Sequence, residues 1–401
     1  MPNNRRDRDN DPSIDIPDFI NYENINDSED FLEDINLSLA KQVSSYQEDT
    51  PPPNNGSKKK KKKMSPFIKI PLFIIILLLV GGSFLLFTKS GNKLLVNLAG
   101  NYIYGNLKYQ PNNVADNNKN EDETKVPSTS IGPVVNILLV GVEEFGGAKN
   151  TDSMMIATMN TKDHTLKLTS LMRDLYVDIP GYSKNRLNSA FAKGGIELLY
   201  ETIELNFDVE LDGYCMVGFD AFQKIIDLVG GVEITLTSEE ADYLNRTNYI
   251  SEKSNRNLVA GTQLVNGNQA LGYCRVRKVS TGTENNDFGR TQRQRIVMEA
   301  IFDKLKSKNI VQLVLIMNNI LTNVEIETDI TQKEFNNYLE AVVGLKAKKI
   351  DTLRIPTDGS YDNIKVQMGK YMQDVLQPRD WDATRADLHS FIYGETTTAT
   401  K

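Results

Sequence analysis

The sequence predicts an α/β fold for residues 133–394, with a central mixed β-sheet that helices cover on both faces. Short apolar runs rich in Val, Ile, Leu and Met alternate along this region with longer segments of helical periodicity. That alternation is typical of layered α/β domains. The region has about 260 residues, enough for one domain with a sizeable core.

The predicted strands are short apolar runs bounded by turn residues. The first, "VVNILLVGV", is apolar throughout, as expected of a strand buried on both faces. Strands are predicted at 134–142, 153–160, 165–172, 213–219, 231–237 and 350–356. The turn "TKDH" joins the second strand to the third, and residues 173–182 are predicted to form a loop.

The predicted helices combine a 3.6-residue apolar period with polar residues at their starts. They are predicted at 187–207, 220–230, 266–274, 287–307, 309–321, 331–345 and 383–394. Asp220, Asn266 and Asp287 are the expected N-caps, because a short side-chain oxygen there accepts hydrogen bonds from free backbone N–H groups. The pair Gly194 and Gly195 is expected to kink or split the first helix.

The chain before this domain is predicted to contain one membrane span. Six lysines, residues 58–63, precede an uncharged apolar run at 70–87, which is long enough to cross a bilayer. The predicted organisation is a disordered acidic tail (1–57), a lysine-rich flank and transmembrane helix (58–88), a stalk (89–132), the α/β domain (133–394) and a flexible C-terminal tail (395–401).

The apolar run has two other interpretations, a cleavable signal peptide and a buried helix of a soluble domain. It begins far into the chain and lacks a small-x-small cleavage site, which favours an uncleaved signal-anchor. Lysines on its N-terminal side predict that the tail is cytoplasmic. We therefore expect a single-pass cell-membrane protein whose α/β domain is extracytoplasmic.

A group of anion-binding side chains brackets one loop of this chain, whose formal net charge is −7. Arg290 and Gln294 are four residues apart on one predicted helix and share a face, whereas Arg295 points elsewhere. Arg275 and Arg277 lie on the same side if the backbone between them is extended. Guanidinium forks suit phosphate oxygens, so the pattern favours a phosphate or pyrophosphate site. The alternatives are a solvated basic face and ion pairs with Asp and Glu.

A second group is acidic and surrounds a Gly-Gly loop. Glu143 and Glu144 end the first strand, and Asp152 begins the next. Carboxylates brought together at strand ends suit Mg²⁺, which often shares phosphate oxygens; the alternative is an ordinary polar loop. Polar residues stand at two further element ends, namely Arg173, Asp174, Arg186 and Asn188.

The only two cysteines, Cys215 and Cys274, both lie in apolar surroundings. In an extracytoplasmic domain they could form a disulfide. Neither belongs to a cysteine-rich framework, which favours two small buried side chains instead.

Several motifs, in order and spacing, resemble the LytR-CpsA-Psr (LCP) family. They are "SLMRDLYVDIPGY", "LNSAFAKGG", "LVNGNQALGYCRVR" and "DFGRTQRQ". The resemblance implies an LCP-type domain on a single membrane anchor in a Gram-positive-type envelope. It implies a Mg²⁺-dependent transferase of cell-wall biogenesis, which moves a teichoic acid or capsule-type polymer from an undecaprenyl-pyrophosphate carrier onto peptidoglycan through a phosphodiester.

The resemblance also implies roles for individual residues. The pyrophosphate ligands are expected to be Arg173, Arg186, Arg275, Arg277, Arg290 and Gln294, and the catalytic residues Arg173, Asp152 and Glu143. Asp152 and Glu143 are the expected metal ligands. Three positions depart from the family pattern: Glu143 replaces an Asp, and Phe145 and Asn150 replace arginines.

Two other functions remain open at this point. One is a non-catalytic envelope regulator that binds a lipid-linked glycan, which the changes at Phe145 and Asn150 favour. The other is a polyprenyl pyrophosphatase using the same site. The expected partners are the lipid-linked glycan, peptidoglycan and the membrane. We expect no nucleic-acid partner, because the chain is acidic and the domain lies outside the membrane.

Overall fold

The computed structural model describes residues 132–145 and 148–394 together with parts of 93–110. The predicted tail, the predicted span at 70–87 and most of the predicted stalk lie outside the described residues. Within the described part of the chain, no helix has the length and apolar character needed to cross a membrane.

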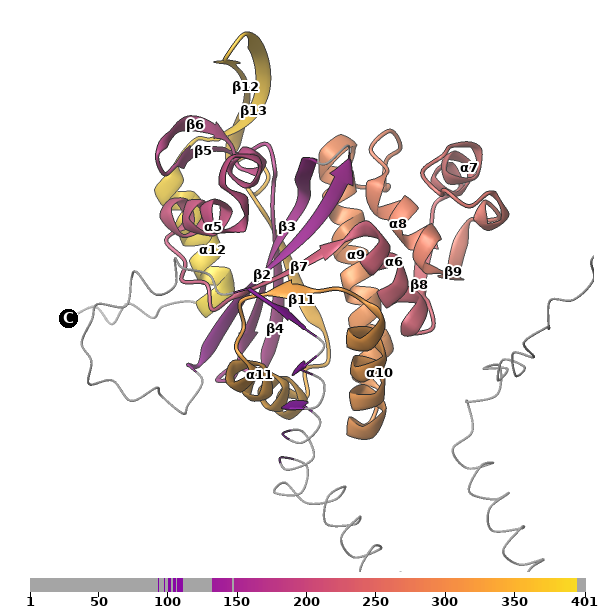
Figure 1. Cartoon of the computed structure of the whole chain (residues 1–401). Coiled ribbons are helices and arrows are strands. Elements are labelled where there is room, and N and C mark those ends of the chain that lie inside the picture. The colour runs from indigo at the N-terminus through magenta and orange to yellow at the C-terminus, as the bar shows by residue number, and fades with distance from the viewer. Residues whose placement is uncertain are drawn as a thin grey trace, which may run out of the picture. The chain divides into compact units, whose positions relative to one another are not determined.

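A seven-stranded mixed sheet forms the centre of the domain, in the order β1-β10-β7-β2-β3-β4-β11 (Figure 1). The strands are β1 (Lys108–Tyr109), β2 (Val134–Phe145), β3 (Ala148–Asn160), β4 (Thr165–Leu171), β7 (Tyr214–Gly218), β10 (Glu327–Thr328) and β11 (Ile350–Ile355). β2 pairs antiparallel with β3 and parallel with β7, while β4 pairs parallel with β11. The predicted mixed sheet is thereby confirmed.

Helices cover both faces of this sheet, as predicted. The α-helices of residues 132–394 are α5 (Asn188–Phe207), α6 (Phe219–Leu228), α7 (Ser238–Arg246), α8 (Gly267–Arg275), α9 (Asn286–Lys306), α10 (Ile310–Asn323), α11 (Gln332–Leu345) and α12 (Trp381–Tyr393), of which α7 lies at the edge of the domain away from the sheet (Figure 1). α5 and α12 pack on one face around a core that includes Leu138 and Phe207, and α9 lies on the other (Figure 1). A second core, which includes Ile226 and Val297, joins α6, α8 and α9.

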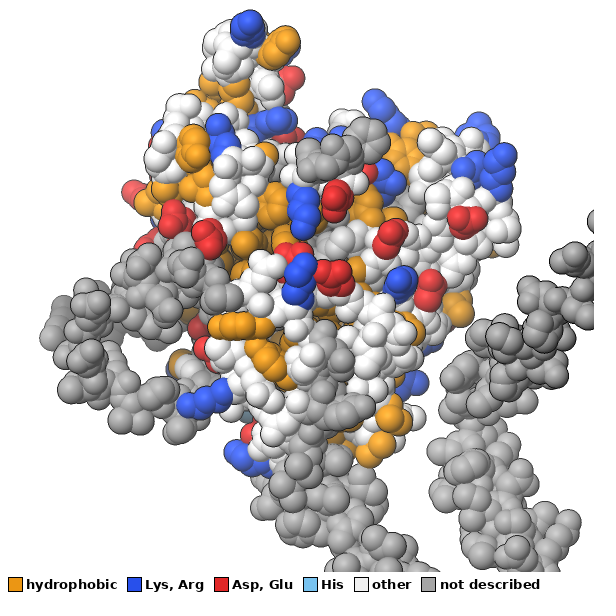
Figure 2. Space-filling view, viewed as in Figure 1, with side chains coloured by type: hydrophobic (Ala, Val, Ile, Leu, Met, Phe, Trp, Pro, Cys, Tyr) orange, Lys and Arg blue, Asp and Glu red, His pale blue; other side chains and the backbone are white. Residues whose placement is uncertain are grey.

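Three two-stranded ribbons complete the domain, and the sequence did not predict them as ribbons. They are β5–β6 (Tyr176–Ile179 and Tyr182–Arg186), β8–β9 (Val232–Leu236 and Gly261–Val265) and β12–β13 (Tyr361–Met368 and Tyr371–Pro378). The predicted loop at 173–182 is therefore wrong in part, because Pro180 and Gly181 form the turn of a hairpin. β12–β13 bears exposed hydrophobic and basic side chains at its tip (Figure 2), so it lacks the apolar run that predicts a strand.

The predicted helix ends are confirmed at one cap and wrong at two. Asn266 caps α8 through a reciprocal pair with Gln269. The caps of α6 and α9 are Gly218 and Asn285, so Asp220 and Asp287 lie within the first turn. There the negative charge of each aspartate interacts favourably with the positive end of the helix dipole. The side chain of Asp287 does not cap the helix and can contact other groups.

Two smaller predictions are confirmed. Gly194 and Gly195 have non-helical backbone angles inside α5, as expected of a kink. Cys215 and Cys274 are free thiols, and burial raises the pKa of Cys215 to about 11 and that of Cys274 to about 12. Such thiols are protonated at neutral pH and unreactive.

Candidate functional site

A cavity of about 800 Å³ lies between the sheet and helices α6, α8 and α9. Its body is apolar. Leu139, Met155, Cys215 and Val217 line it from the sheet, and Phe222, Ile225, Met298 and Ile301 line it from the helices. Because side chains alternate along a strand, Leu139, Gly141 and Glu143 of β2 line this cavity. Leu138 and Val140 enter the opposite core.

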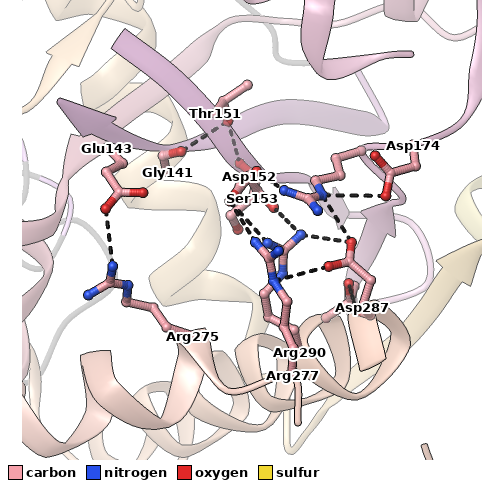
Figure 3. A network of polar contacts seen from close by, with 12 residues as sticks. Gly141, Glu143, Thr151, Asp152, Ser153, Asp174, Arg275, Arg277, Asp287 and Arg290 are labelled. Atoms are coloured by element: carbon pink, nitrogen blue, oxygen red, sulfur yellow. Dashed lines mark hydrogen bonds and ion pairs between the residues drawn. The ribbon is translucent and has the colours of Figure 1, made fainter. Parts of the chain in front are cut away.

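A β-bulge in β3 directs Asp152 into the cavity. Gly141 pairs with Ser153 and Val142 pairs with Thr151, so Asp152 has no partner on β2. The buried hydroxyl of Thr151 donates to the carbonyl oxygen of Gly141 at 2.9 Å. The carbonyl oxygen of Ser153 lies 3.2 Å from the same hydroxyl (Figure 3). Bulges re-aim side chains in this way beside functional sites. As a result, Asp152 and Ser153 both line the cavity.

Three arginines from separate elements converge on Asp152 and Asp287 (Figure 3). The shortest contacts to Asp152 are 2.5 Å from Arg173, 3.0 Å from Arg290 and 3.1 Å from Arg277. The same three guanidinium groups reach Asp287 at 3.1, 2.8 and 3.4 Å. Of the four side chains predicted to converge, Arg277 and Arg290 do so, together with Arg173, whereas Arg275 does not contact Asp152 or Asp287. In this structure the arginines are also in the ion pairs that the alternative interpretation expected.

Arg275 lies apart from these three, although it lines the same cavity (Figure 3). Its guanidinium donates to Glu143 at 3.1 Å and lies 5.0 Å from the centre of the Phe219 ring. Glu143 faces the cavity and also borders a neighbouring polar groove. Glu144 lines only that groove. The strand alternation thus selects Glu143 over Glu144 as the carboxylate that can meet a ligand in the cavity.

The charges of the cluster strongly affect one another. Burial by itself would raise the pKa of Asp152, but Arg290, Arg173 and Arg277 outweigh burial, and this pKa lies below its ordinary value. Burial lowers the pKa of Arg290 to about 10, with Asp287 opposing the effect. Both groups are therefore ionised at neutral pH. Perturbed groups that share a cavity are typical of functional sites.

The acidic residues fit Mg²⁺ only as a site shared with phosphate oxygens. Among the residues that the structure describes, no three or more metal-ligating side chains form a group. Asp152 and Glu143 both line the cavity and are accessible from it. Mg²⁺ often uses one or two carboxylates together with substrate phosphates and water, and the carboxylates of Asp152 and Glu143 are compatible with that arrangement.

The remaining predicted residues differ in their distance from the cluster. Gln294 lines the cavity on α9, one turn after Arg290. Arg186 does not belong to the cavity lining and contacts Asp174 at 3.3 Å, which in turn contacts Arg173 at 3.5 Å. Arg186 therefore reaches the cluster through Asp174.

Two arginines of the same helix are buried away from the cavity. Arg293 is 0% exposed and pairs at 2.8 Å with Glu240, which is 2% exposed. It also donates to the carbonyl oxygens of Val276 and Val279, so it fixes the segment that carries Arg277. Sequence reasoning missed the role of Glu240. The only signal was a capping motif at the start of α7, whose Glu240 side chain accepts from the backbone of Thr237.

Arg295 points away from the cavity, as the helical period predicts, but it is only 9% exposed. Burial and the nearby guanidinium of Arg354 lower its pKa. Arg295 is thus a buried structural residue rather than a freely exposed one.

The LytR_cpsA_psr family model matches residues 102–380. The chain belongs to the LytR-CpsA-Psr (LCP) family. The match includes every residue of the cavity cluster described above, so this cluster lies within the family domain.

Relatives of this LCP protein carry two kinds of name. The chain is 32% identical over 232 residues to polyisoprenyl-teichoic acid–peptidoglycan teichoic acid transferase TagV of Bacillus subtilis (strain 168), covering 56% of this chain and 57% of TagV. It is 31% identical over 258 residues to the TagU transferase of Bacillus cereus (strain AH820), covering 63% and 77%. Regulatory protein MsrR of Staphylococcus aureus (strain COL) is 31% identical over 247 residues, covering 58% and 69%.

The crystal structure of B. subtilis TagV supports the LCP fold. It matches with a TM-score of 0.51 and 26% identity, covering 67% of this chain and 100% of that chain.

Proposed function

We propose that this protein is a membrane-anchored LCP phosphotransferase that moves a glycopolymer from a polyprenyl-pyrophosphate carrier onto peptidoglycan. One observation carries the proposal: Arg173, Arg275, Arg277 and Arg290 surround one part of a cavity whose body is apolar. A ligand with a diphosphate head and a long hydrocarbon chain matches both parts. Apolar walls favour the chain by removing it from water, and guanidinium forks favour the diphosphate.

Charge balance supports a diphosphate as the ligand. Four carboxylates, those of Glu143, Asp152, Asp174 and Asp287, stand against six cationic side chains that line the cavity or pair with Asp174, those of Arg173, Arg186, Arg275, Arg277, Lys278 and Arg290. A diphosphate diester brings two negative charges and so offsets this surplus. A bound Mg²⁺ would neutralise the carboxylates that the arginines leave. The arginines would then turn from the carboxylates to phosphate oxygens, while Asp152 and Glu143 would hold the cation.

The reaction proposed here is a phosphoryl transfer with an acceptor hydroxyl. The hydroxyl oxygen forms a bond to the phosphorus that carries the glycan, and the bond from that phosphorus to the bridging oxygen breaks. The products are a glycan–phosphate–peptidoglycan diester and polyprenyl monophosphate. Bound Mg²⁺ would stabilise charge on the phosphate oxygens.

The arginines and Glu143 have different roles in this reaction. Arg173, Arg277 and Arg290 neutralise the charge of the phosphate oxygens, including the negative charge that grows on the bridging oxygen as its bond to the phosphorus breaks. Glu143, once Arg275 has moved to the ligand, would hold the cation with one carboxylate oxygen and accept the proton of the acceptor hydroxyl with the other.

The names of the relatives support the same activity. TagV and TagU are both named as teichoic acid transferases acting on peptidoglycan. The aligned region spans 57% of TagV, so the substrates and activity of those proteins are proposals for this chain. The name of MsrR, a regulatory protein, favours a second candidate function, a non-catalytic regulator that binds a lipid-linked glycan.

We further propose that residues 70–87 anchor the protein in the cell membrane, with the tail in the cytoplasm and the LCP domain outside. The length of the uncharged run and the six lysines before it support this topology. Protease added to intact protoplasts should remove the LCP domain and leave the tail intact. Digestion of the tail under these conditions would show that the topology is wrong.

The activity is tested with the purified full chain, a polyprenyl-pyrophosphate-linked glycan, peptidoglycan and Mg²⁺. The expected result is an acid-labile phosphodiester between glycan and peptidoglycan, with polyprenyl monophosphate released in equal amount. Release of free glycan phosphate without that linkage, or of inorganic phosphate from polyprenyl pyrophosphate that carries no glycan, would identify a pyrophosphatase. Binding of the lipid-linked glycan without turnover would identify the regulator.

A further inference from the structure

The connection between α9 and α10 and the connection between α11 and β11 meet at one end of the domain. The Lys306 ammonium group donates to the carbonyl oxygen of Lys348 at 3.3 Å, so the two turns are neighbours although they are far apart in sequence. Together they hold five lysines, here called the lysine patch: Lys306, Lys308, Lys346, Lys348 and Lys349. This end of an otherwise acidic chain is therefore basic.

Few carboxylates compensate the lysine patch. Lys306 pairs with Asp303 at 2.6 Å, and Lys349 pairs with Asp351 at 2.5 Å. Within the part of the chain that the structure describes, the other three lysines of the patch have no ion pair. Lys346 and Lys348 are exposed. A patch of this kind attracts anionic surfaces.

An apolar helix face begins directly beside the lysine patch. α10 has no charged residue in its 14 positions. Val311 and Leu315 stand four residues apart near its start and share a face, and Leu315 is 62% exposed. Lysines next to exposed aliphatic side chains are the combination by which proteins contact the surface of an anionic bilayer.

The path of the N-terminal segment shows which surface faces this end. The ring of Tyr104 packs at a tilt against Phe335 near the start of α11, Asn101 contacts Asn336, and Lys93 pairs with Glu340 at 3.1 Å. Followed backwards, the chain therefore runs along α11 toward its C-terminal end, where the lysine patch lies. Figure 1 draws the described residues of 93–110 at the same end of the domain as α10 and α11.

Only residues 88–92 separate Lys93 from the apolar run at 70–87. Five residues span at most about 18 Å even when fully extended, so a bilayer crossed by that run must lie close to Lys93. This argument rests on the membrane anchor proposed above.

We infer that the lysine patch and the Val311–Leu315 face dock the domain onto the anionic surface of the bilayer that holds its anchor. Docking would also orient the cavity. α9 connects the two regions, because Arg290 lies near its start and Lys306 ends it, about 24 Å further along the helix axis. Met298 and Ile301 line the apolar body of the cavity between these two points. A carrier chain could thus enter from the bilayer along α9 while its diphosphate stands at the arginines.

The test uses the full chain in vesicles whose lipids carry brominated acyl chains, which quench tryptophan that enters the bilayer. The chain has a single tryptophan, Trp381, so the unmodified protein gives the background. We compare Leu315→Trp with Leu205→Trp, a control position that is 56% exposed on α5. In vesicles of phosphatidylglycerol and phosphatidylcholine, Leu315→Trp should be quenched strongly and Leu205→Trp should match the background.

A charge reversal tests the lysine patch itself. In the Leu315→Trp background, the triple change Lys306→Glu, Lys346→Glu and Lys348→Glu should weaken docking by at least about a hundredfold, since each lysine near an anionic surface favours docking about fivefold. Quenching should then fall to the background. The matched control, Lys365→Glu with Lys370→Glu on the β12–β13 hairpin, should leave quenching unchanged.

Each result decides one part of the inference. If the chain floats with the vesicles but the tryptophan of Leu315→Trp is quenched no more than the background, the anchor is retained and the docking surface is wrong. A chain that does not float with the vesicles overturns the anchor and the docking surface together. Quenching that survives the triple charge reversal overturns the role of the lysine patch.

Discussion

Replacing Arg290 by lysine separates a guanidinium clamp from a merely positive surface. Arg290 is 3% exposed, and its fork holds Asp152 with one terminal nitrogen and Asp287 with the other. Lysine keeps the charge but offers a single ammonium group, which cannot reproduce two parallel hydrogen bonds. Loss of one preorganised donor in a closed site costs about 3–4 kcal/mol of transition-state stabilisation. We therefore expect kcat/KM for glycan transfer to fall by about 100-fold to 1,000-fold.

The folded state should tolerate this substitution. Asp152 and Asp287 each keep contacts to Arg173 and Arg277, so the free energy of unfolding should fall by only about 1.5–3 kcal/mol, the contribution of one charge-assisted hydrogen bond. Transfer and urea unfolding are measured on the same preparation. Arg246→Lys, at an exposed position in α7, is the matched control and should change neither quantity. Arg295 cannot serve as that control, because it is buried. Unchanged transfer by Arg290→Lys would show that positive charge alone suffices and that the clamp is wrong.

Three further predictions concern the metal, the buried ion pair and acid. Asp152→Asn should abolish Mg²⁺-dependent transfer while the circular dichroism spectrum stays unchanged. A magnesium titration of transfer like that of the wild type would contradict the metal role. Arg293→Met should lower the free energy of unfolding by about 3–5 kcal/mol, because it leaves the charge of Glu240 buried and unpaired, and a loss no larger than that of Arg246→Met would contradict this. Since the folded-state pKa of Asp152 lies below its ordinary value of 3.8, its contribution is complete above that value and is lost as the pH falls through the folded-state pKa. Urea unfolding between about pH 5 and pH 2 should show this loss in the wild type and not in Asp152→Asn, and equal slopes would refute it.

Sequence patterns predicted the central part of the fold well, because periodicity reports burial. The apolar run of β2 is buried on one face by the α5 core and borders the cavity on the other. The helical period of α9 correctly separated Arg290 and Gln294, which line the cavity, from Arg295, which does not. The ribbons were harder to predict, because strands such as β12 keep mostly exposed side chains and gain their order from pairing across a hairpin.

The candidate site was predicted in its residue types but not in its arrangement. The arginines of "RVRKVSTGTENNDFGRTQRQR" pointed to an anion because guanidinium forks suit phosphate oxygens. No pattern indicated that Asp287 would join Asp152 as a second centre of the cluster. The sequence predicts Asp287 as a helix cap. The cap is Asn285 instead, and this leaves the carboxylate of Asp287 available to the arginines.

The sequence alone determined which side chains are available and which face of each element they occupy, because helical and strand periods are local properties of the backbone. What each face meets depends on contacts between distant segments, and only the tertiary structure decided that. The bulge that sends Asp152 into the cavity arises from pairing of β3 with β2. The burial of Arg293 arises from α7, through Glu240. The lysine patch exists because the turn after α9 meets the turn after α11, and the local sequence of neither turn specifies its neighbour.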